Sequence, residues 1–119
     1  MWKTTARIGS DPPRTATAIL IASIASRPAV IVSNDGANST ATRLGRGVLT
    51  VVPVTSNVDR VYPFQVLLPA ESTGLAVDSK AQAEQVRSID VVRVQRRSGS
   101  VPAVLMHELD EALRLHLAL

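Results

Sequence analysis

Cysteine is absent from this chain of 119 residues, so there is no disulfide framework and no thiolate ligand for a metal. Its two histidines, His107 and His116, lie nine residues apart near the C-terminus. At about 100° per residue, this spacing puts them on different sides of a helix, so they cannot act as a pair. We therefore expect no structural zinc site, no metal in a functional site and no cofactor.

Aromatic residues make up only 3% of the chain, namely Trp2, Tyr62 and Phe64. We therefore do not expect a surface that binds nucleobases on rows of stacked rings. The common catalytic signatures are also missing: there is no GxSxG turn, no Walker-type glycine loop and no HExxH pair. Any chemistry has to come from another arrangement of side chains.

Apolar residues make up 45% of the sequence and charged residues 19%, which indicates one folded domain and not a disordered chain. The net charge of +3 is by itself weak evidence for a nucleic-acid partner. Eleven of the thirteen basic residues, however, are arginines. Because the guanidinium group offers a planar fork of donors, this bias favours contacts with phosphate or carboxylate groups.

The apolar segment at 15–25, TATAILIASIA, has about half the length that a membrane span needs, so we expect no membrane association. Basic residues precede it, as in a secretory signal, but Asp11, Pro12 and Pro13 interrupt that charged start. Export of a small domain stays open as an alternative. We expect instead a cytoplasmic protein in which this segment forms a strand or a short helix packed on the domain.

Three segments in the middle of the chain have the β-branched, apolar character of strands: residues 30–32, 48–54 and 61–68. Pro53 predicts a bulge or an edge position in the second of them. The second and third segments are predicted to form a hairpin. Residues 80–87 favour a helix by propensity, residues 88–94 favour a strand, and the basic stretch at 95–99 is predicted to be a turn.

The C-terminal segment is predicted to be a helix, because leucines recur every four residues on one face. They are Leu105, Leu109, Leu113 and Leu117. Ser100 is a candidate N-cap, and Pro102 suits the first turn, where a missing N–H costs nothing.

Arg27 begins the first predicted strand, and Thr55, Ser56 and Asn57 follow the second. If these strands are neighbours in a sheet, the Arg27 guanidinium and the Thr55 hydroxyl can converge on one phosphate. Such a pair suffices for RNA cleavage in which the 2′-hydroxyl is the nucleophile, because the protein then has to orient it, move protons and stabilise charge. An arginine before a strand is more often a solvated flank, and Thr-Ser-Asn is more often a turn.

The chain resembles the MazF/PemK-like toxins, small endoribonucleases of toxin–antitoxin pairs, over residues 27–119. The matching blocks are RPAVIVSND, VVPVTSN, YPFQVLL and AEQVRSID, in family order and followed by the terminal helix. The resemblance implies a mainly β fold, a small SH3-like β-barrel of the CcdB/MazF type with a C-terminal helix. It also implies a homodimer that cleaves single-stranded RNA at specific short sequences without a metal, and a cognate antitoxin that covers the RNA groove with an acidic tail.

The same resemblance implies roles for individual residues. Arg27 matches the catalytic arginine, which moves the proton, and Thr55 matches the catalytic threonine, which steadies the phosphate. Ser56 and Asn57 would flank that site as RNA contacts, and Gln85 would be a further RNA contact. The resemblance also implies a strand, not a helix, in residues 80–87.

Residues 1–26 depart from the family pattern, so we divide the chain into an atypical N-terminal segment, 1–26, and a toxin domain, 27–119. Family members begin with a strand of the type RGEIW, which is not recognisable in MWKTTARIGS. An alternative therefore stays open, in which the protein is catalytically impaired and only binds antitoxin or RNA.

Overall fold

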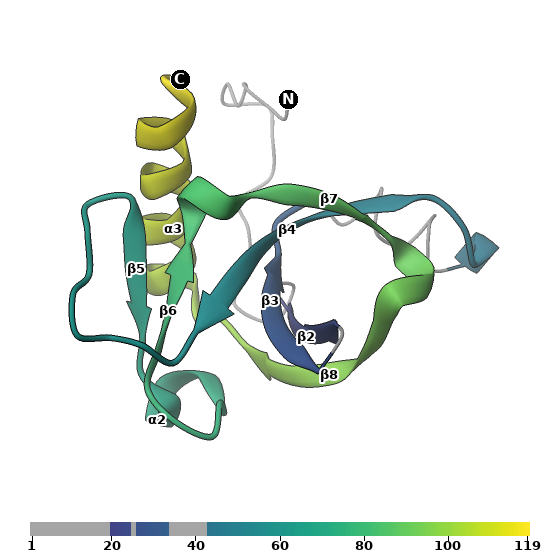
Figure 1. The fold of residues 1–119 in the computed structure, drawn as a ribbon, viewed down its shortest axis with the longest axis horizontal. Coiled ribbons are helices and arrows are strands. Elements are labelled where there is room, and N and C mark those ends of the chain that lie inside the picture. Colours follow the sequence, from purple (N-terminus) through teal and green to yellow (C-terminus); the bar gives the residue numbers. More distant parts are fainter. Residues whose placement is uncertain (1–19, 25, 34–42) are drawn as a thin grey trace.

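The computed structural model describes residues 20–24, 26–33 and 43–119 of the chain. More of these residues lie in strands than in helices, and the longest helix is near the C-terminus (Figure 1). In chain order the elements are β2 (Leu20–Ile24), β3 (Arg27–Ile31), β4 (Val48–Thr55), β5 (Gln65–Leu68), α2 (Ala70–Thr73), β6 (Ser79–Gln82), the 3-10 turn η1 (Ala83–Gln85), β7 (Arg87–Asp90), the 3-10 turn η2 (Val91–Arg93), β8 (Val94–Ser100) and α3 (Ala103–Leu117).

The strands form one seven-stranded antiparallel sheet with the order β5-β6-β4-β3-β2-β8, and β7 pairs with β4 outside this path. Strand β4 is its centre, because it pairs with β7 over residues 48–51, with β3 over 51–53 and with β6 over 54–55. Pro53 therefore lies where a central strand changes partner, and not at the edge of the sheet.

Five of the strands, β7-β4-β3-β2-β8, curl into a ring (Figure 1). The two ends of this ring, β7 and β8, are joined along the chain by η2, and no pairing between them occurs among the described strands. The predicted fold, mainly β with a C-terminal helix, is confirmed. Unlike a complete barrel, however, the sheet is not closed by hydrogen bonds.

Strand β2 fills the position between β3 and β8, with Ile21 opposite Val30 and Ala22 opposite Ala29. The expectation that part of the apolar segment at 15–25 forms a strand on the domain is thus confirmed for Leu20–Ile24. β2 supplies the ring with a strand immediately before Arg27, although no RGEIW-type motif is present. The rest of residues 1–26, apart from Ser26, lies outside the described residues.

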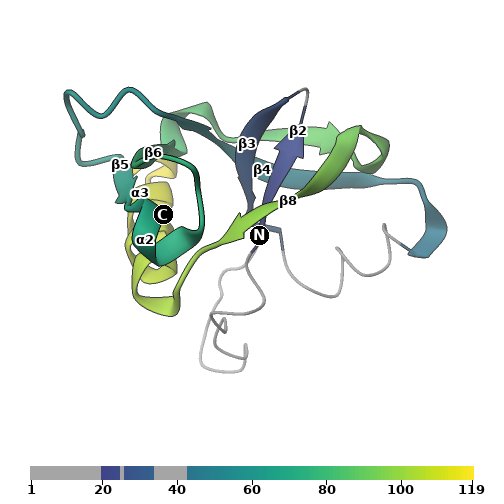
Figure 2. The same ribbon diagram turned by 90° about the horizontal axis from the view of Figure 1, so that it is seen from below.

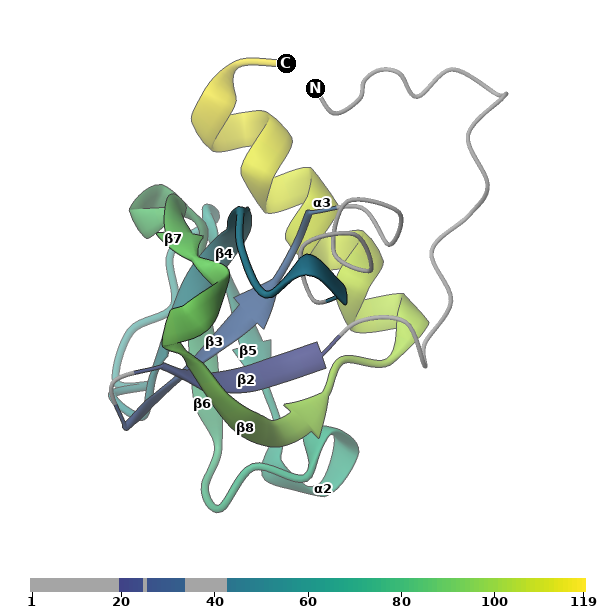
Figure 3. The same ribbon diagram turned by 90° about the vertical axis from the view of Figure 1, so that its right-hand side faces the viewer.

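Two apolar clusters lie on the two faces of the sheet. The larger one is buried between the sheet and α3, which contributes Met106, Leu109, Ala112 and Leu113. The smaller one lies inside the curled part of the sheet, around Ala29, Ile31, Leu49 and Val51. Figure 2 shows α3, α2, β5 and β6 gathered at one end of the molecule. In Figure 3 the C-terminal end of α3 extends beyond the strands.

Three local predictions are wrong. β4 and β5 do not form a hairpin, because β6 lies between them. The stretch 95–99 is not a turn but belongs to β8, where pairing with β2 overrides its polar composition. Ser100 ends β8 and does not cap α3, whose N-cap position is Pro102.

Residues 80–87 form no α-helix, and the strand that the resemblance implied covers half of them. They form part of β6, then η1, and then the first residue of β7. Pairing with β4 and β5 outweighs the helix propensity of this segment. Among the helices described here, none is long and apolar enough to cross a membrane.

Candidate functional site

An open cleft runs along the rim of the curled sheet, with walls from β3, β4, η1 and β7 and from the loop after α2. Its volume is about 1370 Å³. Pockets for small molecules are typically roughly 300–1,000 Å³, so this cleft suits an extended ligand better than a compact one. Of the predicted site residues, Arg27, Thr55, Ser56 and Gln85 line it, and Asn57 does not.

The register between β3 and β4 brings the two main candidates together. The strands are antiparallel neighbours, as expected, and Ala29 lies opposite Pro53. The pairing ends at these two residues, because β4 pairs with β6 at Val54 and Thr55, and Arg27 and Thr55 each lie two residues beyond it at the same end of the two strands. Because side chains two residues apart point to the same face of a strand, both residues belong to the face that carries the smaller apolar cluster. The Arg27 side chain is exposed and has no ion-pair partner among the described residues.

Thr55 is half-buried at the end of β4. Its Oγ1 accepts a hydrogen bond from the backbone N–H of Asn57, with an N–O distance of 3.3 Å. A hydroxyl group has one hydrogen to donate and two lone pairs to accept. The bond from Asn57 therefore orients the Thr55 oxygen and leaves its hydrogen free to donate into the cleft.

Asn57 stabilises the turn that follows Thr55. Its side-chain Oδ1 accepts from the backbone N–H of Asp59 at 3.2 Å, which is the usual asparagine turn bond. Gln85 ends η1, and its carbonyl oxygen accepts from Nε of Arg87 at 3.3 Å. The Gln85 side chain is exposed at the cleft, and the Arg87 side chain is held beside it.

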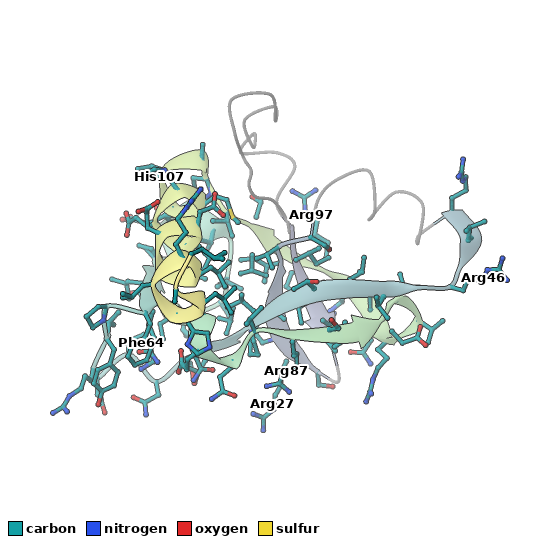
Figure 4. The ribbon with its side chains drawn as sticks, turned by 90° about the horizontal axis from the view of Figure 1, so that it is seen from above. Arg27, Arg46, Phe64, Arg87, Arg97 and His107 are labelled. Carbon is teal, nitrogen blue, oxygen red and sulfur yellow. The ribbon has the colours of Figure 1, made fainter. Side chains whose placement is uncertain are left out.

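The sequence analysis did not identify four further arginines that line the same cleft: Arg87, Arg93, Arg96 and Arg97. In Figure 4, the side chains of Arg27 and Arg87 extend in the same direction. Among the described residues, Asp90 is the only acidic one in the lining, and its Oδ1 accepts a hydrogen bond from the N–H of Val92 and caps η2. The cluster of arginines at 93–97 is the sequence feature that could have indicated these contacts. Because part of this stretch was predicted to be a turn, the sequence did not show which arginine side chains face the cleft.

The described residues contain no group of three or more His, Cys, Asp or Glu side chains arranged to hold a metal ion. Apart from Asp90, the polar side chains of the cleft wall are permanently charged guanidinium groups, hydroxyl groups and amide groups. This set of side chains can bind and neutralise phosphate oxygens.

Comparison with known proteins relates this site to a family. A family model described as PemK-like, MazF-like toxin of type II toxin-antitoxin system matches residues 22–117, a range that begins within β2. Endoribonuclease MazF9 of Mycobacterium tuberculosis is 69% identical over 93 residues, which cover 78% of this chain and 79% of that protein.

Two solved structures share the fold. The Mycobacterium tuberculosis toxin MazF-mt6 has a TM-score of 0.70 and 26% identity, covering 85% of this chain and 96% of that one. A crystal structure of MazE–MazF from Deinococcus radiodurans has a TM-score of 0.65 and 28% identity, covering 90% of this chain and 98% of that one.

Proposed function

The chain belongs to the PemK-like, MazF-like toxins of type II toxin–antitoxin systems, and we propose that it is an endoribonuclease acting as the toxin of such a pair. Its substrate in this proposal is single-stranded RNA, which it cleaves at specific short sequences without a metal ion. The observation that carries the proposal is the pairing of β3 with β4, whose register leads to Arg27 and Thr55 on the wall of an open cleft.

In the proposed reaction the 2′-hydroxyl of one nucleotide attacks the adjacent phosphorus. A new bond forms between the 2′ oxygen and phosphorus, and the bond from phosphorus to the 5′ oxygen breaks. The products are a 2′,3′-cyclic phosphate and a 5′-hydroxyl; the 2′-hydroxyl loses one proton and the 5′ oxygen gains one. The protein has to hold the attacking and leaving oxygens in line and stabilise the charge that develops on the phosphate.

We assign these tasks to Arg27 and Thr55, which both line the cleft. The guanidinium of Arg27 counters the charge of the pentacoordinate phosphate and passes a proton to the departing 5′ oxygen, which is strongly basic at that moment. The Thr55 hydroxyl donates to a non-bridging oxygen. Two observations support this: Arg27 is exposed without an ionic partner among the described residues, and Thr55 keeps its hydrogen uncommitted.

RNA on either side of the scissile bond would follow the cleft wall. Ser56 and Gln85 are proposed as contacts to the nucleotides next to the site, since both line the cleft. Asn57 is retained as a contact through its amide nitrogen, because its amide oxygen already bonds to Asp59. The arginines that sequence reasoning missed, Arg87 and Arg96 among them, suit phosphates farther along the strand.

The family assignment also suggests partners and a location. We propose a cognate antitoxin that covers the cleft with acidic side chains, for which the arginine-rich lining is complementary. We further propose a homodimer in the cytoplasm. The exposed side chains of Leu115, Leu117 and Leu119 at the end of α3 supply apolar surface that a second copy can cover.

The alternative, a catalytically impaired protein that only binds antitoxin or RNA, was based on the missing family-type first strand. Strand β2 weakens that reason, because it pairs with both β3 and β8 and so occupies a place in the ring directly before Arg27. Of the two functions, the structure therefore favours the active endoribonuclease.

The test is cleavage of a single-stranded RNA pool by the purified chain in the presence of EDTA, with the products sequenced. We expect cuts at a short common sequence that leave cyclic phosphate ends. Removing one preorganised charge-stabilising group typically lowers kcat about 10²- to 10³-fold, and we expect that loss for Arg27→Ala. Arg46→Ala is the matched control, because Arg46 is exposed and lies outside the cleft lining.

Loss of cleavage on adding EDTA would overturn the metal-independent mechanism. Cleavage by Arg27→Ala at the rate of the unaltered chain would overturn the assignment of the site. No cleavage by the unaltered chain, together with binding to RNA, would support the impaired alternative.

A further inference from the structure

A bulge in β8 turns one side chain toward the turn that precedes Arg27. In the pairing of β2 with β8, Ser23 lies opposite Arg96 and Ile24 opposite Val94. Successive residues of β2 thus face residues two apart on β8, and Gln95 is the residue that the register skips. A bulge of this kind changes the direction of a side chain, and bulges are common beside active sites.

The Gln95 side chain forms hydrogen bonds with the turn between β2 and β3 and with the end of β2. Its Oε1 accepts a hydrogen bond from the backbone N–H of Ser26 at 3.1 Å and another from the Ser23 hydroxyl at 3.3 Å. The identity of this atom as oxygen follows from chemistry, since a backbone N–H can only donate and so requires an acceptor. One amide oxygen therefore links β8 to both β2 and the turn.

The turn is short and has an unfavourable backbone. Ile24 pairs with Arg27, so only two residues separate the paired positions. Ser26 has a φ of 65°, which a residue with a side chain adopts only when its surroundings hold it there. Its N–H bond to Gln95 is such a constraint, and Ser26 is covalently attached to Arg27.

We infer that Gln95 is a positioning residue for Arg27: its amide oxygen holds the β2–β3 turn in one conformation and thereby aims the Arg27 guanidinium at the cleft. The inference rests on the proposed function, because it assigns Gln95 a task in the same reaction. It concerns the geometry of the site and not contact with RNA. A displacement of about 1 Å at a reacting group can cost on the order of 10²-fold in rate, so a loose turn would lower kcat.

The experiment compares two variants of nearly equal size. Gln95→Met has no acceptor for the Ser26 N–H, whereas Gln95→Glu keeps an oxygen in the same place. We expect Gln95→Met to lower kcat by about 10- to 100-fold with KM changed by less than about threefold. Gln95→Glu should keep kcat within about threefold and raise KM, because its added negative charge repels RNA phosphates.

Amide hydrogen exchange measures the turn independently of activity. Exchange at Ser26 should be much faster in Gln95→Met than in the unaltered chain, and close to the unaltered rate in Gln95→Glu. Exchange at the β3–β4 pairs should not change in either variant, which separates a loosened turn from a loss of folding.

The outcomes distinguish the two proposals. If Arg27→Ala abolishes cleavage but Gln95→Met keeps full kcat, or if Ser26 exchange is unchanged in Gln95→Met, the positioning role is overturned and the proposed function stands. If Arg27→Ala cleaves normally, the proposed function is overturned, and the positioning role falls with it.

Discussion

At the scale of single residues, Gly99 shows how closely β8 passes the end of α2. A Cβ added at Gly99 would lie 2.4 Å from the carbonyl oxygen of Thr73, a distance that real Cβ atoms do not reach. Thr73 cannot easily move away, because it is buried and its hydroxyl donates to the Pro69 carbonyl at 2.8 Å. Position 99 therefore requires glycine for lack of space.

We predict that Gly99→Ala destabilises the protein by at least about 1–3 kcal/mol, the usual cost of overpacking. The measurement is the free energy of unfolding from urea denaturation. Ser98→Ala is the neighbouring control: the Ser98 hydroxyl makes no hydrogen bond with the described residues, so a change within about 0.5 kcal/mol is expected. Equal stabilities for both variants would mean that β8 and α2 are farther apart than described.

At the scale of elements, α3 shows how a repeat in the sequence becomes a buried face. Leucines spaced by four residues advance by about 40° per step on a helix of 3.6 residues per turn, so such a row drifts around the helix. Leu109 and Leu113, in the middle of the row, are buried, whereas Leu117 is 44% exposed. Met106 and Ala112 complete the buried face between α3 and the sheet.

We expect Leu109→Ala to lower the free energy of unfolding by about 2–5 kcal/mol, because Leu109 is fully buried in the larger apolar cluster. Val104→Ala, also in α3 at a position that is 68% exposed, should cost less than about 1 kcal/mol. Both values come from the same denaturation series. Equal losses for the two variants would contradict the assignment of Leu109 to the buried face of α3.

At the scale of the whole molecule, a modest net charge of +3 conceals an uneven distribution. Five arginines line one cleft, and within the described part of the chain Asp90 is the only acidic residue in that lining; the arginines are Arg27, Arg87, Arg93, Arg96 and Arg97. Charge gathered in this way attracts a polyanion more strongly than the net value suggests. The attraction should be sensitive to salt, because binding of a nucleic acid releases counterions.

We predict that affinity for a 2′-deoxy-substituted oligonucleotide, which cannot be cleaved, falls as salt rises. Each phosphate contact on a single strand contributes about −0.7 to the slope of log K against log salt. Arg96→Gln should therefore reduce the slope by about 0.7, whereas Arg46→Gln, outside the cleft, should leave it unchanged. Identical slopes for the two variants, measured by fluorescence anisotropy, would show that Arg96 does not contact phosphate.

Much of this protein follows from the sequence alone, where local signals agree with the final packing. The β-branched run before Ser33 predicts β3, the run before Thr55 predicts β4, and the leucine repeat predicts α3. Arg27 and Thr55 could be named because each stands at the end of one of these strands. The absence of cysteine, and with it of disulfides and thiolate sites, also needs no structure.

Only the tertiary structure decided which strands are neighbours, because backbone pairing between distant segments leaves little trace in composition. It placed β6 between β4 and β5, and it made β8 from a basic stretch that resembled a turn. It also placed Arg27 and Thr55 in the lining of one cleft and brought Gln95, remote in sequence, to the turn before Arg27. Some residues of the candidate site could therefore be predicted from the sequence. Their meeting in one cleft depended on the sheet, because its hydrogen bonds connect distant parts of the chain.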